Sequence, residues 1–167
     1  AAFSAMWATL GLWGAARFGW GPRQIGLVMA VTGVAAALSQ GLFSGWLVRH
    51  LGESRTVALG LCCTGAGLAA QAGSPVALAA VLCLTWAVAG HGLTLPAMSS
   101  LVSKSATPET QGATLGANAA TGSLARVFGP VVAGVLFSAV DIAAPALFAA
   151  AGMLPAAWLA WRAGRRL

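Results

Sequence analysis

The stretch TVALGLCCTGAGLAAQAGSPVALAAVLCLTWAVAGHGLTLPAMSSLVS, residues 56–103, indicates the class of fold because it holds no Asp, Glu, Lys or Arg. A helix of about 20 apolar residues crosses the roughly 30 Å hydrocarbon core of a bilayer, so this run is long enough for two such helices. Gly73-Ser74-Pro75 interrupts the run, and proline is well suited to the first turn of a helix. The stretch therefore predicts two membrane-spanning helices joined by a short turn.

The rest of the chain has the same character. Of its 167 residues, 59% are hydrophobic and 7% are charged, whereas about a quarter of the residues of a soluble domain are charged. Uncharged runs and the breaks between them predict six membrane segments, at about residues 1–16, 23–48, 56–73, 75–102, 111–140 and 144–162. We interpret the short first segment as the end of a truncated helix. The sequence thus predicts an all-α integral membrane protein with a single domain over residues 1–167.

Most of the basic residues fall on one side of the membrane when the predicted segments are threaded through it. The net charge of +6 is therefore explained by membrane orientation and does not indicate a nucleic-acid partner. Threading the six segments through a bilayer places two arginines, Arg17 and Arg23, on one side. The other side receives six basic residues: Arg49, Arg55, Lys104, Arg162, Arg165 and Arg166. Because short cytoplasmic loops carry an excess of Lys and Arg, we predict that this second side, with both ends of the chain, is cytoplasmic.

The cysteines indicate neither a metal site nor a redox site. Cys62, Cys63 and Cys83 lie within apolar segments, where cysteine behaves as a small hydrophobic residue, and their spacing fits no metal or redox motif. We predict no metal, no cofactor and no catalytic group. A membrane-embedded enzyme would need a nucleophile and base, or a metal cluster, on facing helices, and the sequence does not favour one.

Two of the segments carry polar residues along one side. The second holds Thr32, Ser39, Gln40 and Ser44, and in the fifth Thr114, Asn118, Gly122 and Arg126 recur every four residues. These faces are expected to look toward water or toward other helices, so they line a path or form interhelical hydrogen bonds. The last segment has no polar face and is expected to contact lipid nearly all round.

Away from the ends of the predicted spans, one side chain, Arg126, is charged and one histidine, His91, can become charged. Arg126 costs at least about 2.5 kcal/mol within a span, so its guanidinium should meet an acid, a carbonyl or an anionic substrate group, or else extend to the interface. His91, between two glycines, could titrate or bind substrate, or it could be a hydrogen-bonded structural residue. The acids Glu53, Glu109 and Asp141 all fall in predicted loops, so this chain offers no carboxylate at membrane depth.

The stretch GWLVRHLGESR, residues 45–55, is a short basic turn between two predicted spans and, taken alone, is compatible with an ordinary cytoplasmic loop. Its pattern of Gly45, Arg49, Gly52, Glu53 and Arg55 resembles the loop between the second and third helices of each half of major facilitator superfamily transporters. Further stretches resemble the C-terminal half of drug-proton antiporters, especially the tetracycline-efflux type: RFGW at 17–20, Gln40, Pro96, Gln111-Gly112 and Gly129-Pro130.

The fifth segment resembles the antiporter motif G-x8-G-x3-G-P-x2-G-G of that family. The matching positions are Gly116, Ala125, Gly129, Pro130, Ala133 and Gly134, with alanine in place of glycine at 125 and 133. Small residues and a proline let a helix bend and pack closely. The alternative is a membrane helix that is merely kinked.

The resemblance implies one six-helix half of a twelve-helix transporter, whose partner is the missing N-terminal half. It implies alternating-access export of a small drug-like molecule in exchange for protons, in the lipid bilayer of a bacterial inner membrane. The first, second, fourth and fifth segments would line the path, with Gln40, His91, Asn118 and Arg126 as candidate lining residues, and the third and sixth would face lipid. The loop at 45–55 would latch the conformational change.

Two departures separate this chain from the tetracycline pumps. Thr64 stands where those pumps have an acid, and Ala36 where some have a histidine, so tetracycline itself is not implied as the substrate. The alternatives are an importer of a metabolite, a membrane-embedded enzyme, or a membrane scaffold that does not transport.

Overall fold

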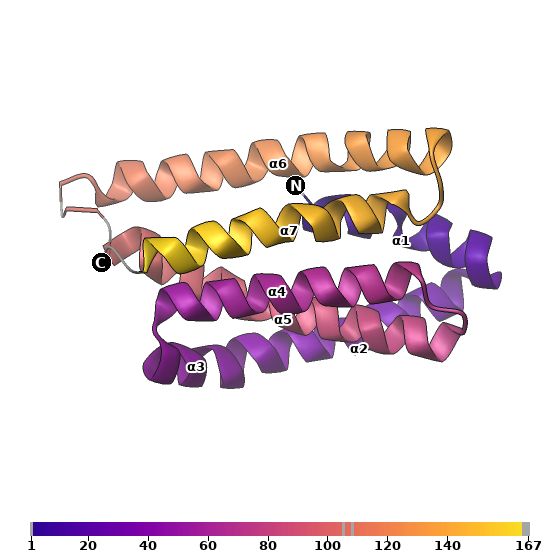
Figure 1. The fold of residues 1–167 in the computed structure, drawn as a ribbon, viewed down its shortest axis with the longest axis horizontal. Helices are drawn as coiled ribbons and strands as arrows, with labels where there is room; N and C mark the ends of the chain where they lie inside the picture. The colour runs from indigo at the N-terminus through magenta and orange to yellow at the C-terminus, as the bar shows by residue number, and fades with distance from the viewer. Residues whose placement is uncertain (1, 105, 108, 165–167) are drawn as a thin grey trace.

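The computed structural model describes residues 2–104, 106–107 and 109–164, and these form helices joined by short connections, with no strand among them (Figure 1). The helices are α1 (Ala2–Phe18), α2 (Pro22–Leu38), the π-helical turn η1 (Ser39–Phe43), α3 (Ser44–Leu51), α4 (Glu53–Ala72), α5 (Ala77–Lys104), α6 (Gln111–Ala139) and α7 (Ala144–Ala163). Because α2, η1 and α3 follow one another without a break, the described residues form six helical segments, close to the predicted ranges. The prediction of an all-α fold is confirmed.

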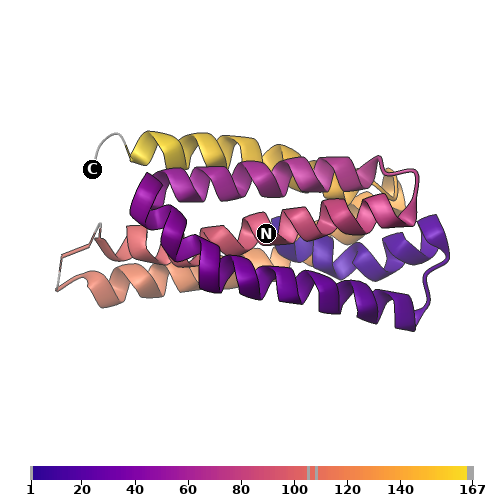
Figure 2. The same cartoon turned by 90° about the horizontal axis from the view of Figure 1, so that it is seen from below.

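Four of the helical segments are long and apolar enough to cross a membrane. They are Pro22–Leu51, Ala77–Lys104, Gln111–Ala139 and Ala144–Ala163. The other two, α1 and α4, lie in the same bundle, and all the helices run roughly along its long axis (Figures 1 and 2). The chain is therefore a multi-pass membrane bundle.

Helix α4 lies between α5 and α7 and has the most extensive packing of the bundle. Its contact with α5 depends on glycines that the sequence patterns did not single out. A Cβ atom at Gly60 would lie 2.6 Å from the carbonyl oxygen of Gly90, and one at Gly67 would lie 2.7 Å from that of Cys83. Both distances are shorter than any Cβ contact tolerates, so α4 and α5 approach as closely as their backbones allow.

Helix α7 does not contact lipid all round, and that prediction is wrong. One face of α7 is buried, including Ala149, Ala150 and Met153, and it packs on α4, where Gly65 faces Met153. The opposite face, with Phe148 and other large apolar side chains, is exposed. Apolar composition does not distinguish a lipid-facing surface from a helix-facing one, because lipid tails are as apolar as leucine.

Two glycines with positive φ end helical segments. Gly19, with φ of 67°, follows α1, and Gly52, with φ of 81°, separates α3 from α4. Around the first of these turns the rings of Trp13, Phe18 and Trp20 pack against one another, with the Phe18 and Trp20 rings stacked at a centroid distance of 5.3 Å. Glycine adopts this left-handed backbone without the steric cost of a Cβ, so the RFGW stretch is a structural turn.

Candidate functional site

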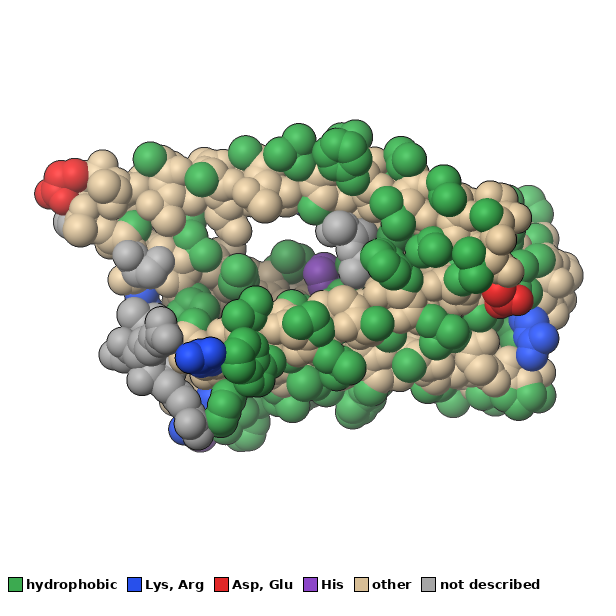
Figure 3. Space-filling view, turned by 45° about the horizontal axis from the view of Figure 1, so that its top comes forward, with side chains coloured by type: hydrophobic (Ala, Val, Ile, Leu, Met, Phe, Trp, Pro, Cys, Tyr) green, Lys and Arg blue, Asp and Glu red, His purple; other side chains and the backbone are tan. Residues whose placement is uncertain are grey.

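Helix α6 is the least buried of the long helices, and a hollow separates part of it from the rest of the bundle. It contacts α1 mainly, and α5 and α7 less, and among its residues Gly129 and Ala133 are buried. The space-filling view shows an opening between α6 and the helices below it (Figure 3). The polar face predicted on this helix is exposed at Asn118 and Arg126.

The start of α1 bridges α5 and α6 at the level of this hollow. The ring of Phe3 stacks on the imidazole of His91 on α5, with centroids 3.7 Å apart and planes 19° apart. The hydroxyl of the next residue, Ser4, donates a hydrogen bond of 3.4 Å to the carbonyl oxygen of Ala125 on α6. His91 on α5 and Ala125 on α6 therefore lie at the same height in the bundle.

The π-helical turn η1 brings a third helix to the same level. A Cβ atom at Gly92 of α5 would lie 2.2 Å from Oγ of Ser39 and 3.4 Å from Cγ of Gln40, so η1 rests directly on the residue after His91. π-helical turns are rare and are frequent at functional sites, because the extra residue shifts the side chains that follow. No pattern in the sequence predicted η1.

His91 lies half-buried in this arrangement with an unused polar atom. Its Nδ1 atom is buried and has no hydrogen-bond partner among the described residues. A buried polar atom without a partner costs free energy unless a ligand or water satisfies it. The sequence left two interpretations of His91 open, a titrating or substrate-binding residue and a hydrogen-bonded structural residue. Among the residues that the structure describes, no hydrogen bond through Nδ1 supports the second.

Arg126 projects from α6 next to Ala125, and within the described part of the chain its side chain meets a hydroxyl. Its Nη2 atom donates a hydrogen bond of 3.3 Å to Oγ of Ser123 one turn earlier, and no ion pair to Arg126 is found among the described residues. The guanidinium is exposed and keeps unused donors. Asn118 lies eight residues earlier, about 12 Å along the helix, so it is not part of this level of the bundle.

The residues that resemble the antiporter motif divide into two groups. Gly129 and Ala133 are buried, and α6 continues as a helix through Pro130. At Gly116 and Gly134, by contrast, an added Cβ would meet no described atom within 4 Å. Within this chain the motif therefore packs only in its middle, and both glycine ends are open.

The loop predicted at residues 45–55 is mostly helical, so the predicted turn is too long. Helix α3 runs to Leu51, and Nε of Arg49 donates to the carbonyl oxygen of Gly45 one turn back at 3.2 Å, as an arginine near a helix end is expected to do. The turn itself is Gly52. Glycine at 45 costs the helix about 1 kcal/mol, which the surrounding apolar helix tolerates.

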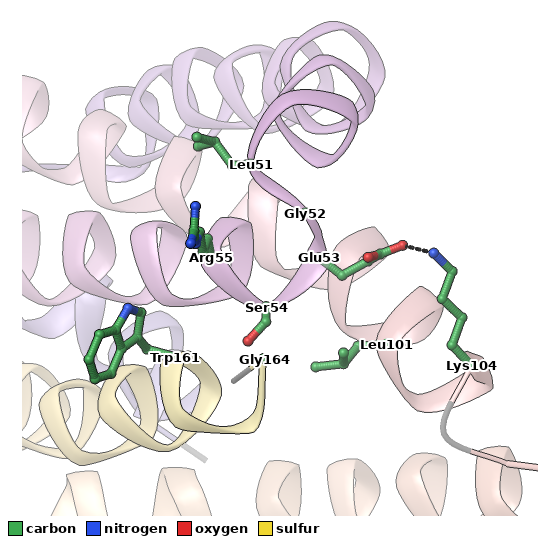
Figure 4. Close-up of a pocket in the computed structure, with 9 residues that line it drawn as sticks. All are labelled: Leu51, Gly52, Glu53, Ser54, Arg55, Leu101, Lys104, Trp161 and Gly164. Atoms are coloured by element: carbon green, nitrogen blue, oxygen red, sulfur yellow. Dashed lines mark hydrogen bonds and ion pairs between the residues drawn. The ribbon is translucent and has the colours of Figure 1, made fainter. Parts of the chain in front are cut away.

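Glu53, the first residue of α4, joins that helix to the end of α5. Its carboxylate forms an ion pair with Lys104 (Figure 4). It also accepts a hydrogen bond of 3.1 Å from Oγ of Ser100. The hydrogen bond from Lys104, followed by bonds from the backbone and Ser100, lowers the pKa of Glu53. The carboxylate is thus held ionised at the end of the bundle.

A pocket of about 650 Å³ opens beside this ion pair. Its lining comes from the end of α3, the start of α4 and the ends of α5 and α7: Leu51, Gly52, Glu53, Ser54, Arg55, Leu101, Lys104, Trp161 and Gly164 (Figure 4). The hydroxyl of Ser54 donates to the carbonyl oxygen of Ala160 on α7. Arg55 and Lys104, which threading placed on one membrane side, therefore lie at the same end of the bundle; Arg165 and Arg166 lie outside the described residues.

No cluster of metal-ligating side chains occurs among residues 2–104, 106–107 and 109–164. The three cysteines are free, and Cys62 is exposed.

A comparison with protein families matches residues 1–166 to the Major Facilitator Superfamily. The chain belongs to this superfamily of transporters. The membrane bundle and the loop pattern around Gly52 are the features that a major facilitator protein is expected to have.

Several curated major facilitator relatives are similar to this chain. The class E tetracycline resistance protein of Escherichia coli is 35% identical over 135 residues, which cover 77% of this chain and 31% of the relative. Multidrug resistance protein 2 of Bacillus subtilis is 34% identical over 134 residues, covering 80% and 33%. The class G tetracycline resistance protein of Vibrio anguillarum is 29% identical over 136 residues, covering 81% and 34%.

The chain spans about a third of the length of these relatives. The comparison with solved structures gives no significant match. The membership of the superfamily rests on the family match over residues 1–166 and on these relatives.

Proposed function

We propose that this chain forms the six-helix C-terminal half of a twelve-helix transporter that exports small drug-like molecules by alternating access. The relatives that support this are named for tetracycline and multidrug resistance, and each is about three times as long as the matched region. The second half would supply the other wall of the path. The open ends of α6 at Gly116 and Gly134 are suitable surfaces for it, because small residues let helices approach closely.

The observation that carries the proposal is that three helical segments present polar side chains at one level of the bundle. Gln40 from η1, His91 from α5 and Arg126 from α6 bring an amide, an imidazole with a buried unpaired nitrogen and a guanidinium to similar heights in an apolar bundle. Polar groups at membrane depth are costly and characteristically mark a substrate path. Aromatic Phe3 beside His91 adds a flat apolar surface for an amphipathic ligand.

Proton coupling, in this proposal, depends on the second half. The three acids of this chain, Glu53, Glu109 and Asp141, lie at helix ends or in connections, so the acid that carries the proton would come from the other half. Arg126 would then face that carboxylate or an anionic group of the substrate. The arginine would bind the acid in one conformational state and release it in the other.

We further propose that the end of the bundle holding Arg55 and Lys104 faces the cytoplasm of a bacterial inner membrane. The excess of basic residues there follows the positive-inside rule, and the relatives are bacterial. The Glu53–Lys104 ion pair would act as a latch that opens and closes with the conformational change.

A chimera tests the function directly. This chain would replace the matched third of the class E protein, and everted membrane vesicles would be assayed for uptake of ethidium and tetracycline. We expect uptake of at least one probe that collapses when the proton gradient is dissipated. A chimera that inserts normally but moves none of a broad substrate panel would rule out efflux, and flux in the opposite direction would favour an importer.

The chain by itself should not transport. Reconstituted alone in liposomes, residues 1–167 are expected to give no proton-linked uptake, because one wall of the path is absent. Robust uptake under these conditions would overturn the assignment as half of a transporter.

A further inference from the structure

A second, apolar groove lies on the outside of the bundle, where α4 and α7 pack together. It has a volume of about 540 Å³, and its lining includes Arg55, Leu59 and Cys62 from α4 and Leu154, Trp158 and Trp161 from α7. Most of these side chains are exposed, with Leu154 at 65% and Trp158 at 52%. The groove is separate from the hollow beside α6, since no described residue of α6 lines it.

Its lining changes character along its length. The residues from Arg55 to Cys62 on α4 span seven positions, about 10 Å of helix, and pass from a charged end to an apolar one. On α7 the two tryptophans lie toward the charged end, where tryptophan is enriched at the level of lipid headgroups. The groove therefore matches a molecule with a polar head and an apolar tail.

Two arginines, Arg55 and Arg162, lie at one end of the groove, and neither forms an ion pair among the described residues. The guanidinium of Arg162 lies over the ring of Trp158, 5.1 Å from its centroid. Arg55 has no hydrogen bond or ion pair among the described residues, and the nearby acid, Glu53, is engaged by Lys104 and Ser100. Two arginines thus remain available to an anion, and their planar donor groups suit a phosphate.

We propose that the α4–α7 groove binds one anionic phospholipid. Its phosphate would lie between Arg55 and Arg162, the tryptophans would flank its glycerol region, and the start of one acyl chain would lie over Leu59 and Cys62. Charge complementarity selects this occupant. An apolar groove alone would accept any lipid tail, whereas two arginines with no ion pair among the described residues favour a negative headgroup. The proposal needs only the membrane bundle and does not depend on transport.

Titration of the full 167-residue chain with two lipids of identical tails tests the proposal. Native mass spectrometry would measure the dissociation constants for dioleoyl-phosphatidylglycerol and dioleoyl-phosphatidylcholine in detergent. We expect phosphatidylglycerol to bind more tightly, and Arg55→Gln and Arg162→Gln each to weaken it by about fivefold without affecting phosphatidylcholine. Arg55→Lys should retain most of the preference, because it keeps the charge.

Two further variants and one competitor distinguish a lipid site in this groove from general electrostatic attraction and from binding of a free phosphate. Arg17→Gln with Arg23→Gln removes two charges at the opposite end, one more than either single variant, and should leave phosphatidylglycerol binding unchanged. Ala58→Trp should fill the groove and weaken both lipids. Soluble glycerol phosphate should not displace the lipid. Equal binding of the two lipids, equal loss in the Arg17 and Arg23 control, or displacement by glycerol phosphate would each overturn the proposal.

Discussion

Replacing Gly92 by alanine tests the contact that brings Gln40 and His91 to the same level. The added Cβ would lie 2.2 Å from Oγ of Ser39 and 3.2 Å from the carbonyl oxygen of Ala36. The serine hydroxyl can rotate away, but the carbonyl belongs to the helix backbone and cannot. Overpacking of this kind costs about 1–3 kcal/mol.

A second effect of the substitution has the opposite sign, and a control measures it. Alanine is better than glycine in a helix interior by about 0.8–1.0 kcal/mol, so the net effect of Gly92→Ala should be a loss of about 0–2 kcal/mol. Gly33→Ala on α2 introduces the same group where no atom lies within 4 Å. The difference between the two variants, about 1–3 kcal/mol, isolates the clash.

Unfolding of the purified chain in mixed micelles, followed by tryptophan fluorescence, would measure both variants. Adding Ser39→Ala to Gly92→Ala removes the nearest atom and should recover part of the lost stability. If Gly92→Ala and Gly33→Ala shift the unfolding midpoint equally, η1 does not rest on α5, and the proposed grouping of Gln40 with His91 loses its support.

Three further predictions concern the charged residues and the aromatic stack. Arg126→Gln in the chimera should abolish transport, since amide donors lack the positive charge, while membrane insertion stays normal; unchanged transport would make Arg126 an interfacial residue. Phe3→Ala should weaken binding of aromatic substrates several-fold, measured by fluorescence titration of the chimera, if the stack on His91 forms part of the path. Lys104→Gln should cost less than about 1 kcal/mol at neutral pH, because the lysine side chain is 65% exposed. Since the pKa of Glu53 is lowered in the folded state, the stabilisation is present above its ordinary value of 4.5 and is lost as the pH falls through the folded pKa. As the pH is lowered from neutral to acidic, the unfolding midpoint of the original chain should therefore fall. The midpoint of Lys104→Gln should fall less over the same pH range.

Much of the architecture was predictable from sequence because a bilayer imposes simple rules on a chain. Uncharged length and breakers such as Gly73-Ser74-Pro75 indicated where helices begin and end, and the structure places the break between Ala72 and Ala77. The loop pattern around Gly52 indicated the family, and Gly52 does adopt the positive φ that favours glycine. The turn proved shorter than predicted, because sequence gives no sharp signal for where α3 stops.

Packing between helices was less predictable, since in a membrane protein both lipid and helix neighbours are apolar. An added Cβ at Gly41 or Gly45, four residues apart on one helical segment, would meet no described atom within 4 Å, whereas Gly60, Gly67 and Gly90 lie at the close backbone contact of α4 with α5. Small residues at a spacing of four are frequent in a glycine-rich chain, and only the tertiary structure decides which of them meet a neighbour. The buried face of α7 was missed for the same reason.

The sequence by itself determined that the chain is a helical membrane protein with a transporter-like loop and a charged residue inside a span, because solvent, charge and chain length act on local sequence. Only the tertiary structure decided that His91 stacks on Phe3, that η1 carries Gln40 to the same level, and that Arg126 has no carboxylate partner among the described residues. Such contacts join residues up to about 120 positions apart, as between Ser4 and Ala125. They depend on how helices pack, which local periodicity does not specify.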